Sequence, residues 1–256
     1  MAERTTYADG EPCWSDISVT DPQAAQGFYG PLFGWTFADQ GEEFGHYTMC
    51  LLAGAPVAAL SPPPPGGESA PPAWSVYLSA GDVDAAVAAA EQAGGRALFP
   101  PMDIPGSGRM AYLLDPTGAG VGFWQAAGFT GAGRRDEPGS VGWCELITPD
   151  GDAADRFYQA VFGYQSQSKL PDATMDYSVW HTDGRDVCGR LATADDPPPR
   201  WLTYFSVADP DQASAKATEL GGQVLREPWD TPYGRMSLIA DPVGARFVVA
   251  GPAPEG

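Results

Sequence analysis

Hydrophobic and polar residues alternate from Cys13 to Thr20, and this alternation is typical of a β-strand with one buried face. The pattern changes at Asp21-Pro22, where a helix-capping residue precedes a proline suited to the first helical turn. Apolar residues at helical spacing continue to Phe33, and Gly34 provides a stop. The chain is therefore predicted to begin with a strand followed by a helix.

Short strand-like segments and one further helix fill the rest of the first half. After the first helix, strands are predicted at 35–38, 47–52 and 56–60. A Pro-rich run at 62–65 is predicted to be a spacer, because proline cannot donate to a sheet ladder. A second unit follows, with a strand at 74–79, a helix at 83–93 that Gly94-Gly95 ends, and strands at 97–99, 110–114 and 120–124.

The second half of the chain repeats the first. Phe28-Tyr29 and Phe33-Gly34 recur 129 positions later as Phe157-Tyr158 and Phe162-Gly163. Other motifs recur with slightly smaller offsets, namely Gly94-Gly95 as Gly221-Gly222, Arg109-Met110 as Arg235-Met236, and Asp115-Pro116-x-Gly118 as Asp241-Pro242-x-Gly244. Ordered matches with small drift indicate a tandem duplication.

The boundary between the two copies is predicted in a Gly-rich, charged stretch. We predict domain 1 at residues 1–126, a linker at 127–139 and domain 2 at 140–256. Each half contains two strand–helix–three-strand units. The sequence thus predicts an α+β protein of four βαβββ units in two tandem domains.

Composition and charge exclude several classes of partner. The formal charge is −19, from 14 Lys+Arg and 33 Asp+Glu, so nucleic acid and anionic membrane surfaces repel the protein. The first residues lack an apolar signal segment, and no run approaches the ~18 apolar residues of a membrane span. Four cysteines without a Cys-x-x-Cys pair are typical of small buried thiols. We expect a cytoplasmic protein.

The repeated motifs, in this order, resemble the vicinal oxygen chelate superfamily, which includes glyoxalase I, extradiol dioxygenases and bleomycin- or fosfomycin-resistance proteins. The resemblance extends from Glu11 to Pro252 and implies curved, mostly antiparallel sheets. The tandem, Trp-rich form is similar to an actinobacterial glyoxalase-like branch, some of whose members act in natural-product pathways or bind drugs. The aromatic residues of the Phe-Tyr-x-x-x-Phe motif are expected to pack each first helix on its sheet.

The resemblance also bears on metal binding. Metal-chelating family members use His, Glu or Gln at strand positions that correspond here to Trp14, Ala59, Ser75 and Gly122 in one half and Trp143, Gly189, Leu202 and Val248 in the other. None of these is a good ligand for a first-row metal. We expect no metal and no cofactor, unless a centre has moved to Asp16, Glu145 or Gln125.

Strand alternation places a tryptophan and a carboxylate on one face in each half, Trp14 with Asp16 and Trp143 with Glu145. The resemblance makes this the ligand-facing side. Arg109 and Arg235 are equivalent, and each forms either a structural ion pair or a contact to a ligand anion. The predicted ligand-binding residues are Trp14, Asp16, Tyr77, Arg109, Trp124, Trp143, Glu145, Tyr204 and Arg235.

Two functional hypotheses follow. The first is a metal-independent protein that binds a hydrophobic, aromatic or amine-bearing small molecule, for sequestration, self-resistance against an antibiotic, or assistance to natural-product biosynthesis. The second is a metal-independent isomerase, cyclase or lyase that uses Asp16, Glu145 or His181 as its acid or base. A metal-dependent glyoxalase-like enzyme with displaced ligands is a third hypothesis. The duplication favours a monomer, in which the two domains reproduce a dimer within one chain.

Overall fold

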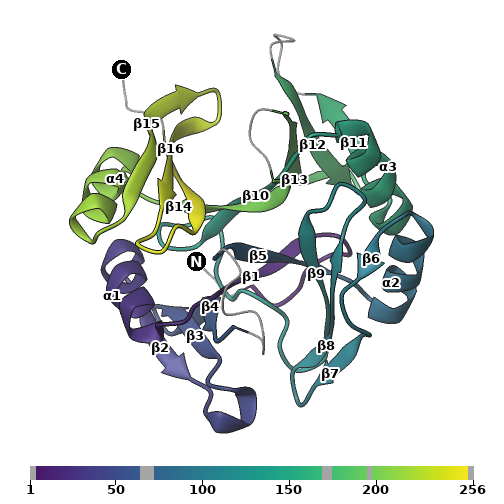
Figure 1. The fold of residues 1–256 in the computed structure, drawn as a ribbon, viewed down its shortest axis with the longest axis horizontal. Helices are drawn as coiled ribbons and strands as arrows, with labels where there is room; N and C mark the ends of the chain where they lie inside the picture. The colour runs from purple at the N-terminus through teal and green to yellow at the C-terminus, as the bar shows by residue number, and fades with distance from the viewer. Residues whose placement is uncertain (1–3, 64–71, 169–174, 195–197, 253–256) are drawn as a thin grey trace.

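Two open β-sheets, each formed by one half of the chain, pack back to back in the computed structural model (Figure 1). The structure describes residues 4–63, 72–168, 175–194 and 198–252. Most strand pairs are antiparallel, and β1/β4, β5/β9, β10/β13 and β14/β17 are parallel. The predicted α+β fold of four βαβββ units is confirmed.

Domain 1 contains the first two units. The first consists of β1 (Pro12–Ser18), α1 (Pro22–Phe33), β2 (Thr36–Asp39), a short 3₁₀ turn (Glu42–Phe44), β3 (Thr48–Leu52) and β4 (Ala55–Ser61). The second consists of β5 (Trp74–Ser79), α2 (Val83–Gln92), β6 (Arg96–Ala97), β7 (Met102–Ile104), β8 (Gly108–Leu114) and β9 (Gly120–Ala126). The sheet order is β2-β3-β4-β1-β5-β9-β8-β6, and β7 pairs with β8.

Domain 2 repeats this arrangement. Its first unit consists of β10 (Val141–Thr148), α3 (Gly151–Phe162), β11 (Gln165–Ser168), β12 (Asp176–Thr182) and β13 (Arg185–Ala192). Its second consists of β14 (Arg200–Ser206), α4 (Pro210–Glu219), β15 (Gln223–Thr231), β16 (Gly234–Ala240) and β17 (Arg246–Gly251). The sheet order is β11-β12-β13-β10-β14-β17-β16-β15.

The predicted and observed elements differ most between α2 and β8. The strand expected at 97–99 is shortened to β6, and the pattern missed β7. Pro100 and Pro101 separate the two short strands because proline supplies no backbone donor to a ladder. Most of the predicted Pro-rich spacer lies outside the described residues.

The helix signals act as predicted. Asp21 accepts a hydrogen bond from the backbone of Ala24 at 3.0 Å, and Gly34 ends α1 with φ +73°. In the second copy, Asp150 accepts from Ala153 at 2.9 Å and Gly163 ends α3 with φ +70°. These local caps explain why α1 and α3 have the same length in both copies.

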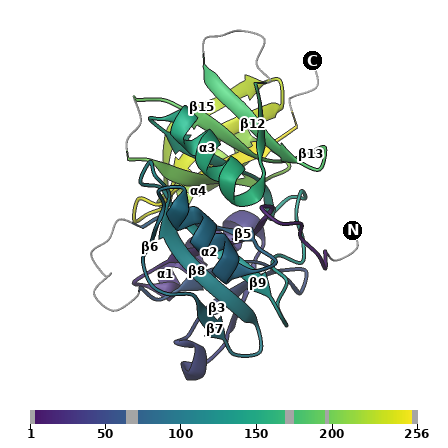
Figure 2. The same cartoon turned by 90° about the vertical axis from the view of Figure 1, so that its right-hand side faces the viewer.

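The helices lie between the domains, with α1 against α4 on one side and α2 against α3 on the other (Figures 1 and 2). Each sheet curves away from its helices. We call the helix-covered, convex face the outer face of the sheet, although it lies between the domains, and the opposite, concave face the inner face. Both outer faces contribute to one hydrophobic core. The ring centroids of Phe33 and Phe205 are 4.7 Å apart, and those of Phe123 and Phe162 are 5.0 Å apart, so aromatic pairs cross the boundary.

The repeated motifs meet across this boundary. The Tyr29 hydroxyl donates to Asp241 at 2.9 Å, and the Tyr158 hydroxyl donates to Asp115 at 3.2 Å. Each bond joins the Phe-Tyr-x-x-x-Phe motif of one copy to the Asp-Pro-x-Gly turn of the other. The motif residues therefore hold the two domains together, in addition to packing each helix on its own sheet as expected.

The segment between the domains is held closely to domain 1. Ala132 donates a backbone hydrogen bond to the Cys13 carbonyl at 2.8 Å, and the Tyr7 hydroxyl donates to the Ala132 carbonyl at 2.6 Å. Gly131 has φ +124°, and a Cβ there would lie 2.4 Å from the Cys13 carbonyl oxygen. Glycine is thus required for this close approach. In the described parts of the chain, no helix is long and apolar enough to cross a membrane.

Candidate functional site

A tryptophan, a carboxyl group and two tyrosines form a buried cluster on the inner face of domain 1. Strand β1 positions Trp14 and Asp16, β5 positions Tyr77, and Tyr47 immediately precedes β3. The Tyr47 hydroxyl accepts a hydrogen bond from Trp14 Nε1 at 2.7 Å and donates to Asp16 at 3.0 Å. The Tyr77 hydroxyl donates to the same Asp16 oxygen at 3.1 Å. This cluster contains three of the predicted ligand-binding residues.

Burial dominates the electrostatics of Asp16. Desolvation raises the pKa of its carboxyl to about 6, and hydrogen bonds from Tyr47, Tyr77 and Ser75 oppose the rise. Ser75 in turn accepts a hydrogen bond from the Tyr112 hydroxyl at 3.1 Å. Polar side chains thus surround the carboxyl group of domain 1.

Domain 2 carries the same cluster with a longer acid. Strand β10 positions Trp143 and Glu145, and the Tyr204 hydroxyl of β14 donates to Glu145 at 3.1 Å. Burial raises the pKa of Glu145 to about 7, and hydrogen bonds from Tyr204 and Tyr177 oppose the rise. At Gly189 a Cβ would lie 2.5 Å from the Tyr177 hydroxyl and 2.9 Å from Trp143 Nε1, so glycine leaves the room that this pair occupies.

Sequence reasoning missed Tyr47 and Tyr177, which complete the two clusters. They occupy equivalent positions in the duplicated units, 130 residues apart. The repetition of this tyrosine is the signal that would have found them. In both copies it lies at the start of the strand that precedes the last strand of the first unit. Their partners became visible only when the strands were placed side by side.

The two inner faces differ in how they are covered. In domain 1, Phe129 of the connecting segment packs its ring edge to face on Trp14 at a centroid distance of 4.8 Å. Trp124 donates from Nε1 to the Phe129 carbonyl at 2.8 Å, and Trp14 and Trp124 are only 6% and 8% exposed. In domain 2, Trp143 is only partly buried. The connecting segment therefore covers the tryptophan of domain 1 more fully than Trp143 is covered in domain 2.

The structure does not bring Arg109 and Arg235 to the inner faces. Arg109 lies on β8 on the same side as Ala111 and Leu113, which belong to the shared core behind the sheet. Its guanidinium binds Asp84 of α2 at 2.8 Å and Asp103 of β7 at 2.9 Å. Of the two roles considered, the geometry matches the structural ion pair.

Arg235 repeats this arrangement in domain 2. It binds Asp211 of α4 at 2.6 Å and Asp230 of β15 at 2.9 Å. The aspartates of both arginines are largely exposed, so solvent screening keeps the contribution of these ion pairs to stability small.

The candidate base His181 is separated from the cluster of domain 2. It lies four residues beyond Tyr177 on β12, which corresponds to about 13 Å along a strand. Its Nδ1 atom is buried without a hydrogen-bond partner among the described residues. Asp16 and Glu145 are thus the candidate acids or bases that lie within the aromatic clusters.

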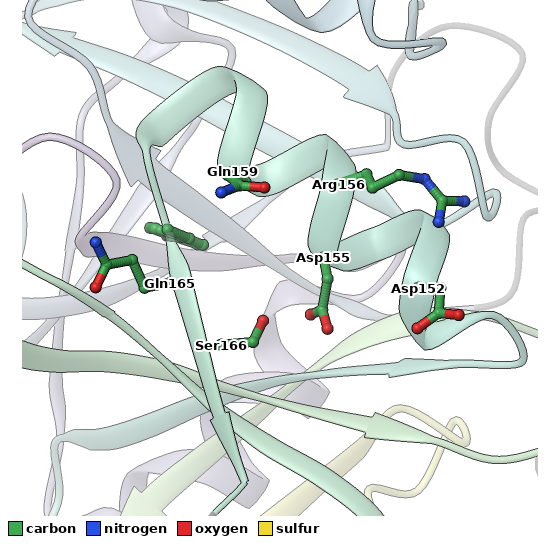
Figure 3. A pocket seen from close by; sticks show the side chains of 7 residues that line it. Asp152, Asp155, Arg156, Gln159, Gln165 and Ser166 are labelled. Carbon is green, nitrogen blue, oxygen red and sulfur yellow. The ribbon is translucent and has the colours of Figure 1, made fainter.

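A separate polar pocket of about 360 Å³ lies on the surface of domain 2, beside α3 and β11 (Figure 3). Its lining consists of Asp152, Asp155, Arg156, Gln159, Tyr164, Gln165 and Ser166. Asp155 there binds Arg190 at 3.0 Å and accepts from Trp180 Nε1 at 2.6 Å. The pocket lies away from both clusters, and Asp155 serves the packing of α3 on its sheet.

The back-to-back sheets and the repeated units define a tandem-domain member of the vicinal oxygen chelate class. Residues 14–123 and 140–249 match the model of the Glyoxalase/Bleomycin resistance protein/Dioxygenase superfamily, and the chain belongs to this family. It is 42% identical to a putative glyoxylase, CFP32, of Mycobacterium tuberculosis over 100% of both chains. It is 38% identical to the anthracycline biosynthesis protein DnrV of Streptomyces peucetius, over 96% of this chain and 94% of that protein.

Solved structures of the family share the fold. The Mn(II)-bound glyoxalase from Novosphingobium aromaticivorans matches 99% of this chain and 89% of its own with a TM-score of 0.66 and 17% identity. The 2,3-dioxygenase LapB from Pseudomonas matches 97% of this chain and 94% of its own with a TM-score of 0.67 and 12% identity. At these identities the likeness concerns the fold.

The residues at the family's metal positions do not fit a metal ion. In domain 1 they are Trp14, Ala59, Ser75 and Gly122, and in domain 2 Trp143, Gly189, Leu202 and Val248. Each inner-face cluster offers one carboxyl group, which its tyrosines already engage. Within the described residues, no three His, Cys, Asp or Glu side chains are grouped so that they could hold one metal ion.

Proposed function

We propose that this protein binds a flat, hydrophobic aromatic small molecule on an inner face, without a metal, and so assists a biosynthetic pathway or sequesters the compound. One observation carries the proposal: both domains have a tryptophan, a carboxyl group and two tyrosines at equivalent positions of their inner faces. Duplicated polar groups that are buried and hydrogen-bonded to one another form a preorganised surface rather than ordinary packing.

The chemistry of the cluster matches an aromatic ligand. Indole and phenol rings provide flat apolar surfaces that stack on other aromatic rings, and their N–H and O–H groups fix a polar substituent. The names of two relatives point in the same direction, since both are called anthracycline biosynthesis proteins. Anthracyclines are fused aromatic ring systems, and a compound of this class is the ligand type that we infer.

A second candidate function rests on Glu145. A carboxyl group with its pKa near 7 exchanges a proton readily at neutral pH, and its place among aromatic side chains would put that proton beside a bound ring. An isomerase, cyclase or lyase that uses Glu145 as its acid or base is therefore the alternative. The same experiment separates the two functions.

The test is a calorimetric titration with a panel of fused-ring aromatic compounds, followed by mass spectrometry of each compound after incubation. We expect saturable binding that Trp143→Ala weakens at least tenfold, about 1.4 kcal/mol. Trp143→Phe, which keeps a ring, should retain most of the affinity. Phe44→Ala, at an exposed site in domain 1, is the control that should change nothing.

The outcomes separate binder from enzyme. A compound that returns unchanged supports the binding function. A compound that returns with altered mass or retention indicates an enzyme, and Glu145→Gln should then abolish the conversion. Equal affinity in wild type and Trp143→Ala would contradict the proposed site.

A further inference from the structure

A row of paired residues crosses the inner face of domain 2 and leads from the cluster to an arginine. Trp143 pairs with Tyr204, Tyr204 with Val248, Val248 with Leu238, and Leu238 with Arg226. Directly paired residues in neighbouring strands lie on the same face of a sheet. Arg226 of β15 is therefore on the same face as Glu145, at the far end of the sheet.

Trp229 holds the guanidinium of Arg226 in place. The Arg226 Cζ atom lies over the Trp229 ring at 3.8 Å from its centroid, a cation–π contact. Trp229 pairs with Met236, which belongs to the apolar cluster of the inner face. The stacked pair thus faces the same side as the tryptophan and tyrosines around Glu145.

The sheet curves so that its two ends approach each other. Strands β12 and β15 lie near opposite ends of the sheet order, which would separate them by roughly 30 Å if the sheet were flat. Yet Tyr233, in the turn between β15 and β16, lies close enough to Tyr177 of β12 to affect its pKa, and Arg226 lies close enough to Tyr204 to do the same. Figure 1 shows the strands at both ends rising on the side away from the helices. Arg226 and Tyr233 therefore lie near the cluster, although they come from the opposite end of the sheet.

Arg226 differs from the other arginines discussed above in lacking an acidic partner among the described residues. The side chain is exposed, and it forms no ion pair with any residue in the described part of the chain. Arg109 and Arg235, by contrast, each bind two aspartates. In a protein with a formal charge of −19, an arginine left without an acidic partner beside an aromatic cluster is available to an anion.

Domain 1 has no counterpart of this arginine. At the offset of 127 that relates Gly94 to Gly221, Phe99 takes the place of Arg226. Met102 pairs with Met110 and takes the place of Trp229 at the same offset. Both side chains are exposed, at 37% and 47%. The cation therefore distinguishes the inner face of domain 2 from that of domain 1.

We propose that the inner face of domain 2 binds a planar aromatic ligand that carries an acidic oxygen, a carboxylate or a phenolate, and that Arg226, stacked on Trp229, contacts this group. The inference rests on the proposed function and adds the domain and the ligand's charge. It differs from the amine-bearing ligand that the acidic composition favours. The ring of the ligand lies among Trp143, Tyr177 and Tyr204, and its acidic oxygen points toward β15.

The experiment uses three probes on one ring system: anthraquinone-2-carboxylate, anthraquinone-2-carboxamide and 2-(aminomethyl)anthraquinone. Calorimetric titration of the full chain should show that the carboxylate binds at least tenfold more tightly than the carboxamide. Arg226→Gln should reduce this ratio to within twofold and leave the affinity for the carboxamide unchanged. Arg226→Lys should keep part of the preference, because it keeps the charge but loses the planar fork.

The control is Arg96→Gln, an exposed arginine on β6 of domain 1, which should preserve the full preference. A preference that survives in Arg226→Gln would overturn the inference and leave the proposed function standing. Equal binding of all three probes, or tightest binding of the amine, would overturn it in the same way. If no probe binds, both the proposed function and this inference are contradicted.

Discussion

The two inner faces share one framework and differ in nearly everything around it. Each has a tryptophan, a carboxyl group and two tyrosines at equivalent positions. Around this framework the equivalent residues differ as follows, with domain 1 first: Ser75 and Leu202, Tyr112 and Leu238, Gly122 and Val248, Trp124 and Ala250, Phe99 and Arg226, Met102 and Trp229. The duplicated cluster is thus present in both domains, while the residues around it have diverged.

The two tryptophans show this divergence most directly, because other side chains cover them to different extents. The connecting segment places Phe129 against Trp14 and bonds Ala132 to β1, so the cluster of domain 1 is part of the packed interior. Trp143 remains partly exposed, and the exposed side chains of Arg226 and Tyr233 lie near the tyrosines of its cluster. We therefore expect domain 1 to be the structural copy and domain 2 the binding copy.

The largest expected effect that tests this contrast is on stability. Trp14→Ala should lower the free energy of unfolding by about 3 to 5 kcal/mol, because it removes a buried aromatic side chain and leaves a cavity. Trp143→Ala should cost clearly less, because that ring already contacts solvent. Urea denaturation followed by circular dichroism measures both, and equal losses would remove the distinction between a structural and a binding copy.

The carboxyl groups provide a second test, through pH. Burial raises the pKa of Glu145 from its ordinary 4.5 to about 7, so between these values the folded state holds a proton that the unfolded state has lost. Stability therefore falls as pH rises from 4.5 to 7 and is level above, by at most about 3 kcal/mol from this group. In Glu145→Gln this fall should be absent.

Asp16 contributes a fall of the same sign in a lower window, from 3.8 to about 6. Asp16→Asn should therefore remove the slope at lower pH than Glu145→Gln does. Denaturant midpoints measured at several pH values compare the two variants. Identical profiles would show that the two acids sit in equivalent environments.

A smaller effect is expected from one added methyl group. Position 59 is alanine in domain 1, whereas the equivalent Gly189 approaches Tyr177 and Trp143 too closely for a Cβ. Gly189→Ala should destabilise the protein by about 1 to 3 kcal/mol and weaken ligand binding as the cluster shifts. The reverse change, Ala59→Gly, is the matched control and should leave binding unchanged. Thermal unfolding and calorimetric titration give the two readouts.

Much of the fold followed from local patterns. The strand alternation before Asp21, the caps at Asp21 and Gly34, and the repeat at a nearly constant offset predicted four βαβββ units, and the structure confirms them. The placement of Trp14 with Asp16, and of Trp143 with Glu145, also followed from alternation alone. For Arg109 the same alternation indicates the outer face of the sheet, because its side chain lies on the same side of β8 as Ala111 and Leu113.

The elements, their caps and the placement of an indole and an acid on one strand face follow from neighbours within a few residues, and the duplication follows from comparing the two halves of the chain. The fold was needed to show that Tyr47 and Tyr177 complete the clusters, that Phe129 covers Trp14, and that Arg226 lies on the inner face of domain 2. These features depend on strand register, sheet curvature and chain crossings between residues far apart in sequence. Local periodicity carries no information about such contacts. In this protein these contacts are what make the inner faces of the two domains different.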